Sequence, residues 1–303
     1  MSRLLTRRTL APLLQKRFIA GSAAVAETCG RETQPLLAGH SLAYQYLGAN
    51  VPYQRALQIQ HATVRALQAQ GPAAVESGPE FSNRGAVPNV MYLLQHAPVY
   101  TAGRRIKGTD ATEGNRLRDL GAEYYEVQRG GETTYHGPGQ LIGYPILNLK
   151  SLSLSVRCYV SLLERGLIRA CHDGFGLTDA TTSPHTGVWC GDNKIAALGV
   201  HVSRYVTIHG FALNVTCEPL PWFEHIVPCG IVGKGVTSVA KELERRMNIT
   251  KGMEVDVVGD AIPSVLDGFS TEWGVQWSKC EKSHPEWSEQ VRRWVRDGVP
   301  GQF

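Results

Sequence analysis

The order of strand-like and helix-like segments along the chain constrains its fold most. Short apolar or alternating runs, typical of strands, are interspersed with longer amphipathic runs of helical period. The two kinds of segment do not follow the regular strand–helix–strand order of a parallel sheet with crossover helices. We therefore predict an α+β fold, in which helices flank a mixed sheet. No internal repeat is present in the sequence.

The expected elements follow from these periods. Strands are predicted at 41–47, 90–94, 124–128, 141–149, 188–190, 194–202 and 205–215, and helices at 53–70, 156–171, 237–246 and 255–269. The polar residues 191–193 fit a tight turn between two antiparallel strands, and the Gly-, Pro-, Ser- and Glu-rich segment 70–89 fits an exposed loop. Pro145 predicts a bulge or an edge position for its strand, because proline cannot donate a backbone hydrogen bond.

Composition and charge limit the class of protein further. The chain has 303 residues, of which 43% are hydrophobic and 19% charged, a balance typical of a globular protein with a sizeable core. No apolar run reaches about 18 residues, so no membrane-spanning helix is predicted. The net charge of +4 is uneven, because residues 1–26 hold five cations and no acid. The remainder carries a net charge of −1, which argues against a broad nucleic-acid-binding face.

The N-terminal segment 1–28 has the character of a mitochondrial presequence. It is rich in arginine and poor in acids, and it places Leu10, Leu13 and Leu14 on one helical face. Pro12 weakens that helix, and an ordinary basic N-terminus is the alternative. We predict a presequence at 1–28 and a location in the mitochondrial matrix.

Seven cysteines are spread along the chain at long spacings, with no C-x-x-C pair. An odd count without close pairs fits neither a disulfide framework nor a zinc knuckle. Reduced thiols are therefore expected, as in a matrix-like compartment. Cys171 ends the predicted helix 156–171, whose apolar stripe contains Val156, Val160 and Leu163, and we expect it to lie in the core.

Four stretches carry residue types suited to binding or chemistry. In the first, 129–140, Gly130 and Gly131 allow a backbone to approach a ligand closely, while Tyr135 and His136 supply a hydroxyl and an imidazole. The Gly-Pro-Gly that follows enforces a turn. A structural turn with one hydrogen-bonded histidine explains these residues equally well. The spacing is not that of a phosphate-binding loop.

The other three stretches contain Lys194, His209 and Cys229. Lys194 opens an apolar strand, where it is either a solvated strand end or an amine beside an apolar wall. His209 precedes Gly210, a strand glycine that indicates a bulge or the close approach of a ligand; a buried, hydrogen-bonded histidine is the alternative. Cys229 lies between Pro and Gly in a turn, where backbone N–H groups can stabilise a thiolate or an oxyanion. A lone cysteine is more often structural than catalytic. The turn around Cys229 shifts that balance only modestly toward a catalytic role.

Together these stretches resemble the octanoyltransferases of lipoate biosynthesis. The resemblance is carried by RGGETTYHGPGQLIGYPILNL, KIAALGVHV, HGFALNV and PCGI, and by VYTAGRR upstream of them. It follows the family's order from about Pro98 to Ser238 and implies a fold of the biotin/lipoyl protein ligase type. On this basis we predict a catalytic domain at 35–275, followed by a polar C-terminal tail at 276–303.

The resemblance also implies roles for individual residues. Cys229 corresponds to the family's nucleophile and Lys194 to its lysine, with His209 in a supporting position. It implies no metal and no cofactor. The residues implied to bind the acyl substrate are Arg129, Gly130, Gly131, Glu132, Thr133, Thr134, Tyr135, His136, Ala197, Leu198, Gly199, Gly210, Phe211 and Ala212.

The implied activity is the transfer of an octanoyl group from octanoyl-acyl carrier protein to a specific lysine. Cys229 would take the octanoyl group as a thioester, and the lysine would then attack it. Lys194 would either favour the thiolate as an ammonium or accept the proton of the attacking amine. The partners implied are the carrier protein, lipoyl domains of 2-oxoacid dehydrogenase E2 subunits and the glycine-cleavage H protein, without nucleic acid or membrane insertion. We expect a monomer, with Arg104, Arg105 and Lys107 in the carrier-docking patch.

Three alternatives remain. An ATP-dependent lipoate–protein ligase has the same fold, but it activates a free acid as an adenylate and needs no cysteine nucleophile. The biotin-type G-R-G-R-x-G loop of such enzymes is absent from this sequence. A scaffold that only binds lipoyl domains would not need both Lys194 and Cys229. A thioesterase would use water in place of the acceptor lysine and would release free octanoate.

Overall fold

The computed structural model of the chain describes residues 36–70, 86–106, 111–227, 233–247 and 258–301. The predicted presequence, most of the predicted loop 70–89 and Cys229 lie outside these described residues. None of the described helices is both long enough and apolar enough to cross a membrane.

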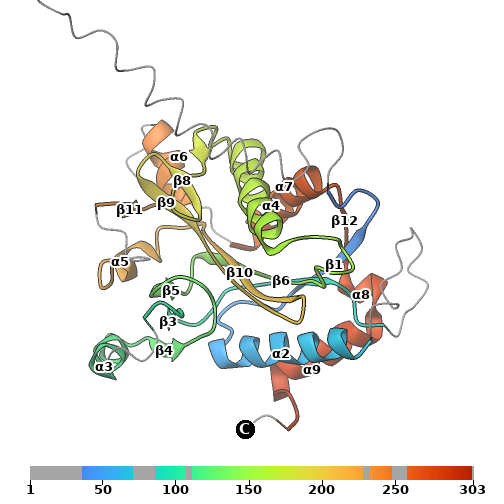
Figure 1. The fold of residues 1–303 in the computed structure, drawn as a ribbon. Coiled ribbons are helices and arrows are strands. Elements are labelled where there is room, and N and C mark those ends of the chain that lie inside the picture. Colours follow the sequence, from blue (N-terminus) through green and yellow to red (C-terminus); the bar gives the residue numbers. More distant parts are fainter. Residues whose placement is uncertain (1–35, 71–85, 107–110, 228–232, 248–257, 302–303) are drawn as a thin grey trace, which may run out of the picture.

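A mixed sheet runs through the middle of the molecule (Figure 1). Its strands lie in the order β12 (Gln276–Lys279), β1 (Ser41–Tyr46), β2 (Val90–Leu94), β6 (Gln140–Ile146), β10 (Val206–Asn214), β9 (Asn193–Ser203), β8 (Val188–Cys190) and β7 (Ala180–Thr181). Strand β1 is parallel to both β12 and β2, whereas the other neighbours in this order are antiparallel. A short strand β11 (Gly235–Val236) pairs with the first residues of β9, where β10 no longer reaches.

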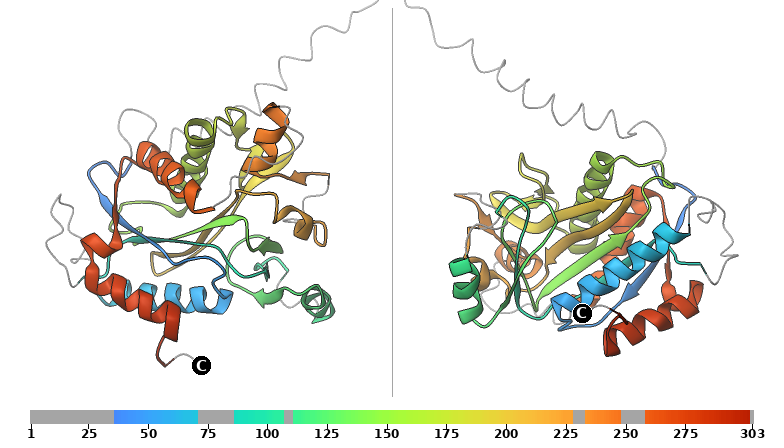
Figure 2. Two further views of the ribbon diagram at one scale, coloured as in Figure 1. Left: turned by 180° about the vertical axis from the view of Figure 1, so that it is seen from behind. Right: turned by 60° about the horizontal axis from the view of Figure 1, so that its bottom comes forward.

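Helices cover both faces of this sheet. α4 (Val156–Arg169) and α7 (Ala261–Trp273) lie together on one face, and α2 (Tyr53–Ala69) and α9 (Pro285–Asp297) lie on the other (Figure 1, Figure 2). The predicted α+β fold, a mixed sheet with flanking helices, is confirmed.

Strand β2 shows why some strand sequences are apolar without a break. Met91 and Leu93 join the core beneath α4 and α7, while Val90, Tyr92 and Leu94 join the core beneath α2 and α9. Successive side chains of a strand point to opposite faces, so a strand buried on both faces needs apolar residues at every position.

A smaller sheet lies to one side of the main one (Figure 1). Its strands are, in order, β4 (Glu123–Glu126), β3 (Val99–Ala102) and β5 (Thr134–His136). The loop between β4 and β5 contacts the main sheet, because the Gly130 N–H donates a hydrogen bond of 3.1 Å to the Val200 carbonyl of β9. The small sheet therefore holds the predicted binding loop against β9.

Most predicted elements are confirmed, including the hairpin of β8 and β9. Helix α6 (Val239–Met247) is also close to its predicted bounds. Cys171 is buried, as predicted, within a π-helical turn that continues α4 over residues 170–174. The predicted stripe of α4 is shifted, however: Val156 is 48% exposed, and Tyr159 and Leu162 are buried instead.

The edge position predicted for the strand that contains Pro145 is wrong. Strand β6 lies inside the sheet, between β2 and β10. Its ladder with β10 is interrupted around Pro145, yet Phe211 lies opposite Gly143 and Val206 lies opposite Asn148. These two pairs share one register, so no residue is inserted as a bulge would require. The interruption of the β6–β10 ladder accommodates the backbone N–H that Pro145 lacks.

The C-terminal segment is not the separate polar tail that the sequence predicts. Strand β12 adds to the main sheet beside β1, and a short helix α8 (Cys280–Ser283) leads into α9. Trp287, Val291 and Trp294 share one face of α9 and join the core with α2. The mostly charged sequence of α9 hides this spacing of large apolar residues.

Candidate active site

A cavity of about 450 Å³, partly open to solvent, lies beside the antiparallel pair β9 and β10. The loop after β4, strand β5 and the first residue of α2 complete its wall. We call this space the acyl cavity. Its lining residues are Tyr53, Arg129, Gly130, Gly131, Thr134, His136, Tyr144, Ala197, Leu198, Gly199, His209, Gly210, Phe211 and Ala212.

Most residues that the sequence assigns to acyl binding line this one cavity, although they come from three separate stretches. Glu132, Thr133 and Tyr135 do not. In β5, Thr134 and His136 face the cavity, so Tyr135 points to the opposite side of the strand. There its ring stacks on Trp222, with 5.0 Å between centroids.

Two aromatic residues of the cavity were missed by the sequence analysis. Tyr53 is the first residue of α2, and Tyr144 lies in the middle of β6. Tyr144 stands inside the motif RGGETTYHGPGQLIGYPILNL, which was a usable signal. Nothing in the sequence around Tyr53 connects it to the other stretches, because its place depends on how α2 packs.

Arg129 holds the loop after β4 in place. Its guanidinium donates to the Thr101 carbonyl at 2.6 Å and to the Thr101 hydroxyl at 2.7 Å. It also donates to the Glu132 carbonyl at 2.9 Å and the Gly130 carbonyl at 3.0 Å. The side chain is only 7% exposed, so these bonds compensate for burial of its charge. Arg129 thus ties β3 to the loop that covers the cavity.

Two glycines make room for close contacts between these elements. A Cβ on Gly199 would lie 3.0 Å from Arg129 Cδ and 3.3 Å from the Gly130 carbonyl oxygen. A Cβ on Gly210 would lie 2.2 Å from the Gly143 carbonyl oxygen and 2.6 Å from Pro145 Cδ. The close approach predicted at Gly210 is therefore made by the neighbouring strand, whereas Gly199 lets the binding loop rest on β9.

Lys194 lies at one end of this strand pair. It is the second residue of β9, between Trp189 of β8 and Val236 of β11. The residue is 7% exposed, and its Nζ lies 4.9 Å from the centroid of the Trp189 ring, a cation–π distance. Burial raises the pKa of Glu164, while the Gly187 N–H and the positive charge of Lys194 oppose that rise. The lysine is therefore buried against an aromatic ring, which excludes the solvated strand end.

Neutral histidines lie along the cavity wall and behind it. Burial lowers the pKa of His96 to about 4. Its Nδ1 lies 2.9 Å from the Val51 carbonyl, which can only accept, so this nitrogen carries the proton. Its Nε2 then accepts from the Tyr144 hydroxyl at 2.7 Å. The pKa of His136 is likewise well below its usual value, because of burial first and then of His96 and Arg129.

His209 was considered a supporting residue, and it lines the acyl cavity. It is 4% exposed, and burial, followed by the charge of Arg129, lowers its pKa to about 3. The hydrogen-bond partner expected for a buried histidine is not found for its ring among the described residues, although its backbone N–H donates to Gln60 Oε1 at 2.8 Å.

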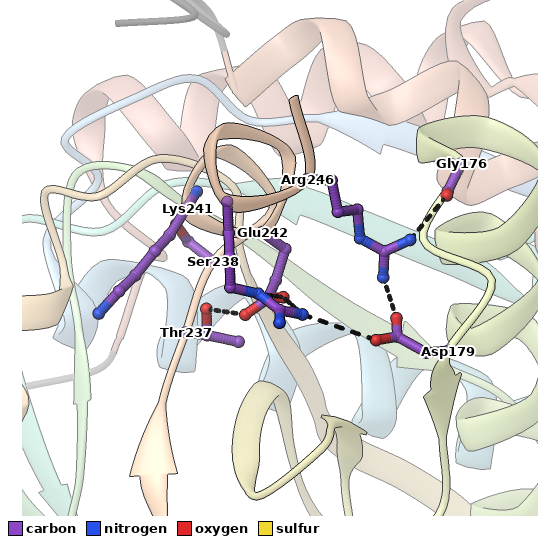
Figure 3. Close-up of polar contacts among 8 residues, drawn as sticks. Gly176, Asp179, Thr237, Ser238, Lys241, Glu242 and Arg246 are labelled. Atoms are coloured by element: carbon purple, nitrogen blue, oxygen red, sulfur yellow. Dashed lines mark hydrogen bonds and ion pairs between the residues drawn. The ribbon is translucent and has the colours of Figure 1, made fainter. Parts of the chain in front are cut away.

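Cys229 lies outside the described residues, but hydrogen bonds and an ion pair hold the described stretch from Thr237 to Arg246. The Thr237 hydroxyl donates to Glu242 Oε1 at 2.7 Å, and Arg246 pairs with Asp179 (Figure 3). Ser238 caps α6, because its hydroxyl accepts a backbone N–H of the first turn. These bonds fix α6 and the end of β11 next to Lys194.

The other cysteines show several environments. Cys171, Cys190, Cys217 and Cys280 are free thiols, and only Cys217 of these four is exposed. Cys158 is disulfide-bonded, so the expectation of reduced thiols is wrong at that position. Burial raises the pKa of Cys171, Cys190 and Cys280, which makes the thiolate of each unfavourable.

Comparisons with known proteins identify the family to which this fold and its cavity belong. A model of the lipoyl protein ligase A/B catalytic domain matches residues 55–257. The chain belongs to this family. It is 50% identical to a mitochondrial octanoyl-acyl-carrier-protein:protein N-octanoyltransferase of Danio rerio, over 62% of this chain and 78% of the relative. It is 46% identical to the Homo sapiens enzyme of the same name, over 67% of this chain and 85% of that relative.

Solved structures are similar in fold at low sequence identity. Lipoate-protein ligase A bound with ATP superposes with a TM-score of 0.53 at 11% identity, over 86% of this chain and all of that one. The bipartite lipoate protein ligase of Thermoplasma acidophilum gives 0.52 at 12% identity, over 87% of this chain and 99% of that one. At such identity the likeness concerns the fold alone.

The names of the relatives confirm two predictions, the kind of reaction and the location in the cell. The chain is an acyltransferase, as the resemblance implied, and its location is mitochondrial.

Proposed function

We propose that this chain transfers an octanoyl group from octanoyl-acyl carrier protein to a lysine of a lipoyl domain or of the glycine-cleavage H protein, through a thioester on Cys229. The position of Lys194 carries the proposal: this buried amine lies on the strand pair whose next residues line the acyl cavity. Relatives named octanoyltransferases, 42–50% identical, support the octanoyl group.

In the first step the Cys229 thiolate attacks the thioester carbonyl carbon of octanoyl-acyl carrier protein. A new C–S bond forms, the carrier's C–S bond breaks, and the carrier leaves as a thiolate that takes up a proton. A free cysteine is only a few per cent ionised at neutral pH. The ammonium of Lys194 would favour the ionised form by attraction. Cys229 precedes β11, which pairs with β9 at Lys194, by six positions in the sequence, and this short connection supports the pairing of roles.

In the second step the neutral amine of the acceptor lysine attacks the octanoyl-Cys229 thioester. An amide C–N bond forms, the bond to Cys229 breaks, and the proton of the amine goes to a base. Lys194 in its neutral form is our candidate for that base. One residue would then act first as a charge and later as a proton acceptor, and the thiolate released from Cys229 would favour its reprotonation.

The acyl chain would lie along the β9–β10 pair. Ala197, Gly199 and Ala212 leave space over the sheet, and Phe211 and Tyr144 add aromatic surface. Each buried methylene contributes about 0.8 kcal/mol, so an apolar cavity favours an eight-carbon chain strongly over acetyl. No metal or cofactor enters this mechanism.

The decisive experiment is intact-mass analysis of the protein after incubation with octanoyl-acyl carrier protein, before and after addition of an apo lipoyl domain. We expect one octanoyl group on the enzyme, and its transfer to the acceptor. Cys229→Ala should abolish both signals. Cys217→Ala is the matched control, because Cys217 is a free, exposed thiol, and it should leave both signals intact. Octanoyl transfer by Cys229→Ala at the wild-type rate would overturn the covalent mechanism.

The same mixtures separate the alternatives. Acceptor modification that requires ATP and free octanoate indicates a ligase. Octanoate released without an acceptor indicates a thioesterase. Binding of the lipoyl domain without any acyl-enzyme indicates a scaffold.

We also propose that residues 1–28 are the presequence and that Arg104, Arg105 and Lys107 belong to the carrier-docking patch. Arg104 and Arg105 are exposed next to the loop that covers the cavity, with their N–H groups bonded to the Arg129 and Gly131 carbonyls. For the presequence, Arg3, Arg7 and Arg8 changed together to Glu should stop import into isolated mitochondria. Undiminished import of that variant would count against a presequence.

A further inference from the structure

A second cavity lies directly beyond the acyl cavity. It lies between α2 and the far ends of β9 and β10, and its volume is about 940 Å³ when the space open to solvent is included. Leu57, Val64 and Ile208 give it an apolar side, and His201 contributes from β9. Among the described residues that line the two cavities, His209 is the one they share.

The backbone holds His209 in an unusual position. Its φ is +62°, in the left-handed region that non-glycine residues seldom adopt. On the β6 side, His209 lies opposite Pro145, where the β6–β10 ladder is interrupted. On the β9 side, His209 is still paired with Val200. Its backbone N–H therefore donates to Gln60 of α2 instead of to β6. The imidazole is thus fixed between the two cavities by a defect in the sheet.

The ring forms an uncharged partition between the two cavities. It is almost fully buried, makes no side-chain hydrogen bond to a described residue, and meets Tyr144 edge to face at 6.1 Å. Burial lowers its pKa to about 3, so it carries no charge near neutral pH. An uncharged ring can lie against a hydrocarbon chain without the cost of burying a charge.

The order of residues along the strands places this ring opposite the reactive end. On β9 the order is Lys194, then Ala197–Gly199 in the acyl cavity, then His201 in the second cavity. Strand β10 runs the other way and presents Gly210–Ala212 and then His209. The β9 lining of the acyl cavity begins at Ala197, and Val200 is the residue paired with His209. At about 3.3 Å per residue, these two residues are roughly 10 Å apart along the strand. An acyl chain that enters the cavity from the Lys194 side would therefore point its methyl end toward His209.

We propose that His209 closes the far end of the acyl cavity and sets the length of acyl chain that the enzyme accepts. Without the imidazole the two cavities become continuous, and the chemical class of substrate widens from octanoyl to acyl groups of about twelve carbons. This inference rests on the proposed octanoyl transfer. Each methylene that enters the second cavity favours the longer chain by about fourfold.

The test uses His209→Gly in the full chain, because glycine adopts a φ of +62° without strain. Transfer from octanoyl- and dodecanoyl-acyl carrier protein to an apo lipoyl domain is measured as kcat/KM for each. We expect the dodecanoyl-to-octanoyl ratio to rise at least tenfold over wild type. His201→Ala is the matched control, because it enlarges the second cavity and leaves the partition in place, so its ratio should stay at the wild-type value.

Two further variants keep the inference falsifiable. Leu57→Trp added to His209→Gly refills the second cavity and should return the ratio toward the wild-type value. If His209→Gly does not fold, as judged by circular dichroism, His209→Asn replaces it, since asparagine tolerates the left-handed region and is smaller than histidine. An unchanged ratio in a folded variant that still transfers octanoyl overturns the inference.

Failure of the proposed function would look different, because wild type itself would then transfer no octanoyl from the carrier. In that case the thermal shift produced by dodecanoate relative to octanoate still tests the partition. A larger relative shift in His209→Gly than in wild type supports it, and an equal one overturns it.

Discussion

The two ends of the β9–β10 pair are built in opposite ways. At one end Lys194 is a buried amine that lies over the Trp189 ring, and its charge acts on the partly buried Glu164. At the other end the His209 ring is uncharged and makes no hydrogen bond to a described residue, and the local sheet ladder is interrupted. Between them the strands present small and apolar residues. One end can thus stabilise changes of charge, and the other excludes charge.

This difference separates chemistry from substrate choice. Groups that move protons or bear charge need partners that respond to charge, such as an aromatic face or a carboxylate. A wall that measures a hydrocarbon chain needs only shape and the absence of charge. Changes at the Lys194 end should therefore act on rate and pH dependence, whereas changes along the neutral wall should act on selectivity or stability.

The largest effect is expected from Lys194→Ala. Loss of a group that assists proton transfer typically lowers the rate by about 100-fold or more. The defect in acylation should shrink as pH rises toward about 8.5, because a cysteine thiol then ionises without help. Acyl-enzyme formation followed by mass spectrometry over a pH series measures this. A defect of constant size at every pH would show that the lysine only positions the substrate.

Lys194→Arg divides the two roles of the lysine. Arginine keeps the positive charge but does not release its proton under ordinary conditions. We expect acylation to recover partly in this variant while transfer to the acceptor lysine stays slow. Equal recovery of both steps would remove Lys194 as the base of the second step.

The uncharged histidines along the cavity wall and behind it, His96, His136 and His209, should make the free energy of unfolding depend on pH. The pKa of His96 is lowered from 6.5 to about 4 in the folded protein, so the unfolded chain binds a proton more readily between these values. Its stabilising effect is therefore present above the unfolded pKa and is lost as pH falls. Between about pH 7 and pH 5 this one residue should cost about 2 kcal/mol of unfolding free energy. Urea denaturation at both pH values measures the loss.

His96→Gln is the matched variant for that measurement. A glutamine amide can still donate to Val51 and accept from the Tyr144 hydroxyl, but it does not titrate. The acid-induced loss of stability should therefore be smaller in the variant by about the amount given above. An identical pH dependence in both proteins would show that His96 is not kept neutral by the fold.

The sequence alone predicts local parts of this architecture well and non-local parts poorly. The hairpin of β8 and β9 and the helix α2 follow from periodicity within one segment. Strand β12 pairs with β1 from the other end of the chain, and no local pattern announces that contact. The prediction of a bulge or an edge position at Pro145 failed for the same reason. Whether a strand residue needs its backbone N–H depends on the residue opposite it in the neighbouring strand, which the local sequence does not reveal.

The site shows a similar division. A shared motif order joined Arg129, Lys194 and Gly210, although they are far apart in sequence. Tyr53 enters through the packing of α2, and Tyr135 turns away through the alternation of β5. Motifs thus indicated which stretches meet, whereas side-chain direction needed the structure.

A moderate effect is expected from Trp189→Leu compared with Trp189→Phe. Both variants lose the hydrogen bond from the indole N–H to the His185 carbonyl and some packing, but only leucine removes the aromatic face under Lys194. A cation–π contact of this lysine is worth about 1 kcal/mol, so acylation by the leucine variant should be about fivefold slower. Equal rates, with pH profiles that coincide, would show that the ring only packs.

The smallest effect is expected from charge reversal at the carrier-docking patch. Burial first, and then the charge of Arg104, lower the pKa of His201, which lines the second cavity, so Arg104 lies near the His209 end of the strand pair. Lys107 lies outside the described residues. Arg104→Glu with Arg105→Glu should lower kcat/KM for octanoyl-acyl carrier protein a few-fold at low salt and flatten its salt dependence. Lys241→Glu, an exposed reversal on α6 beyond β11, is the comparison at the opposite end. A larger salt-dependent loss from Lys241→Glu would place carrier docking beside Lys194 and remove the arginine patch from that role.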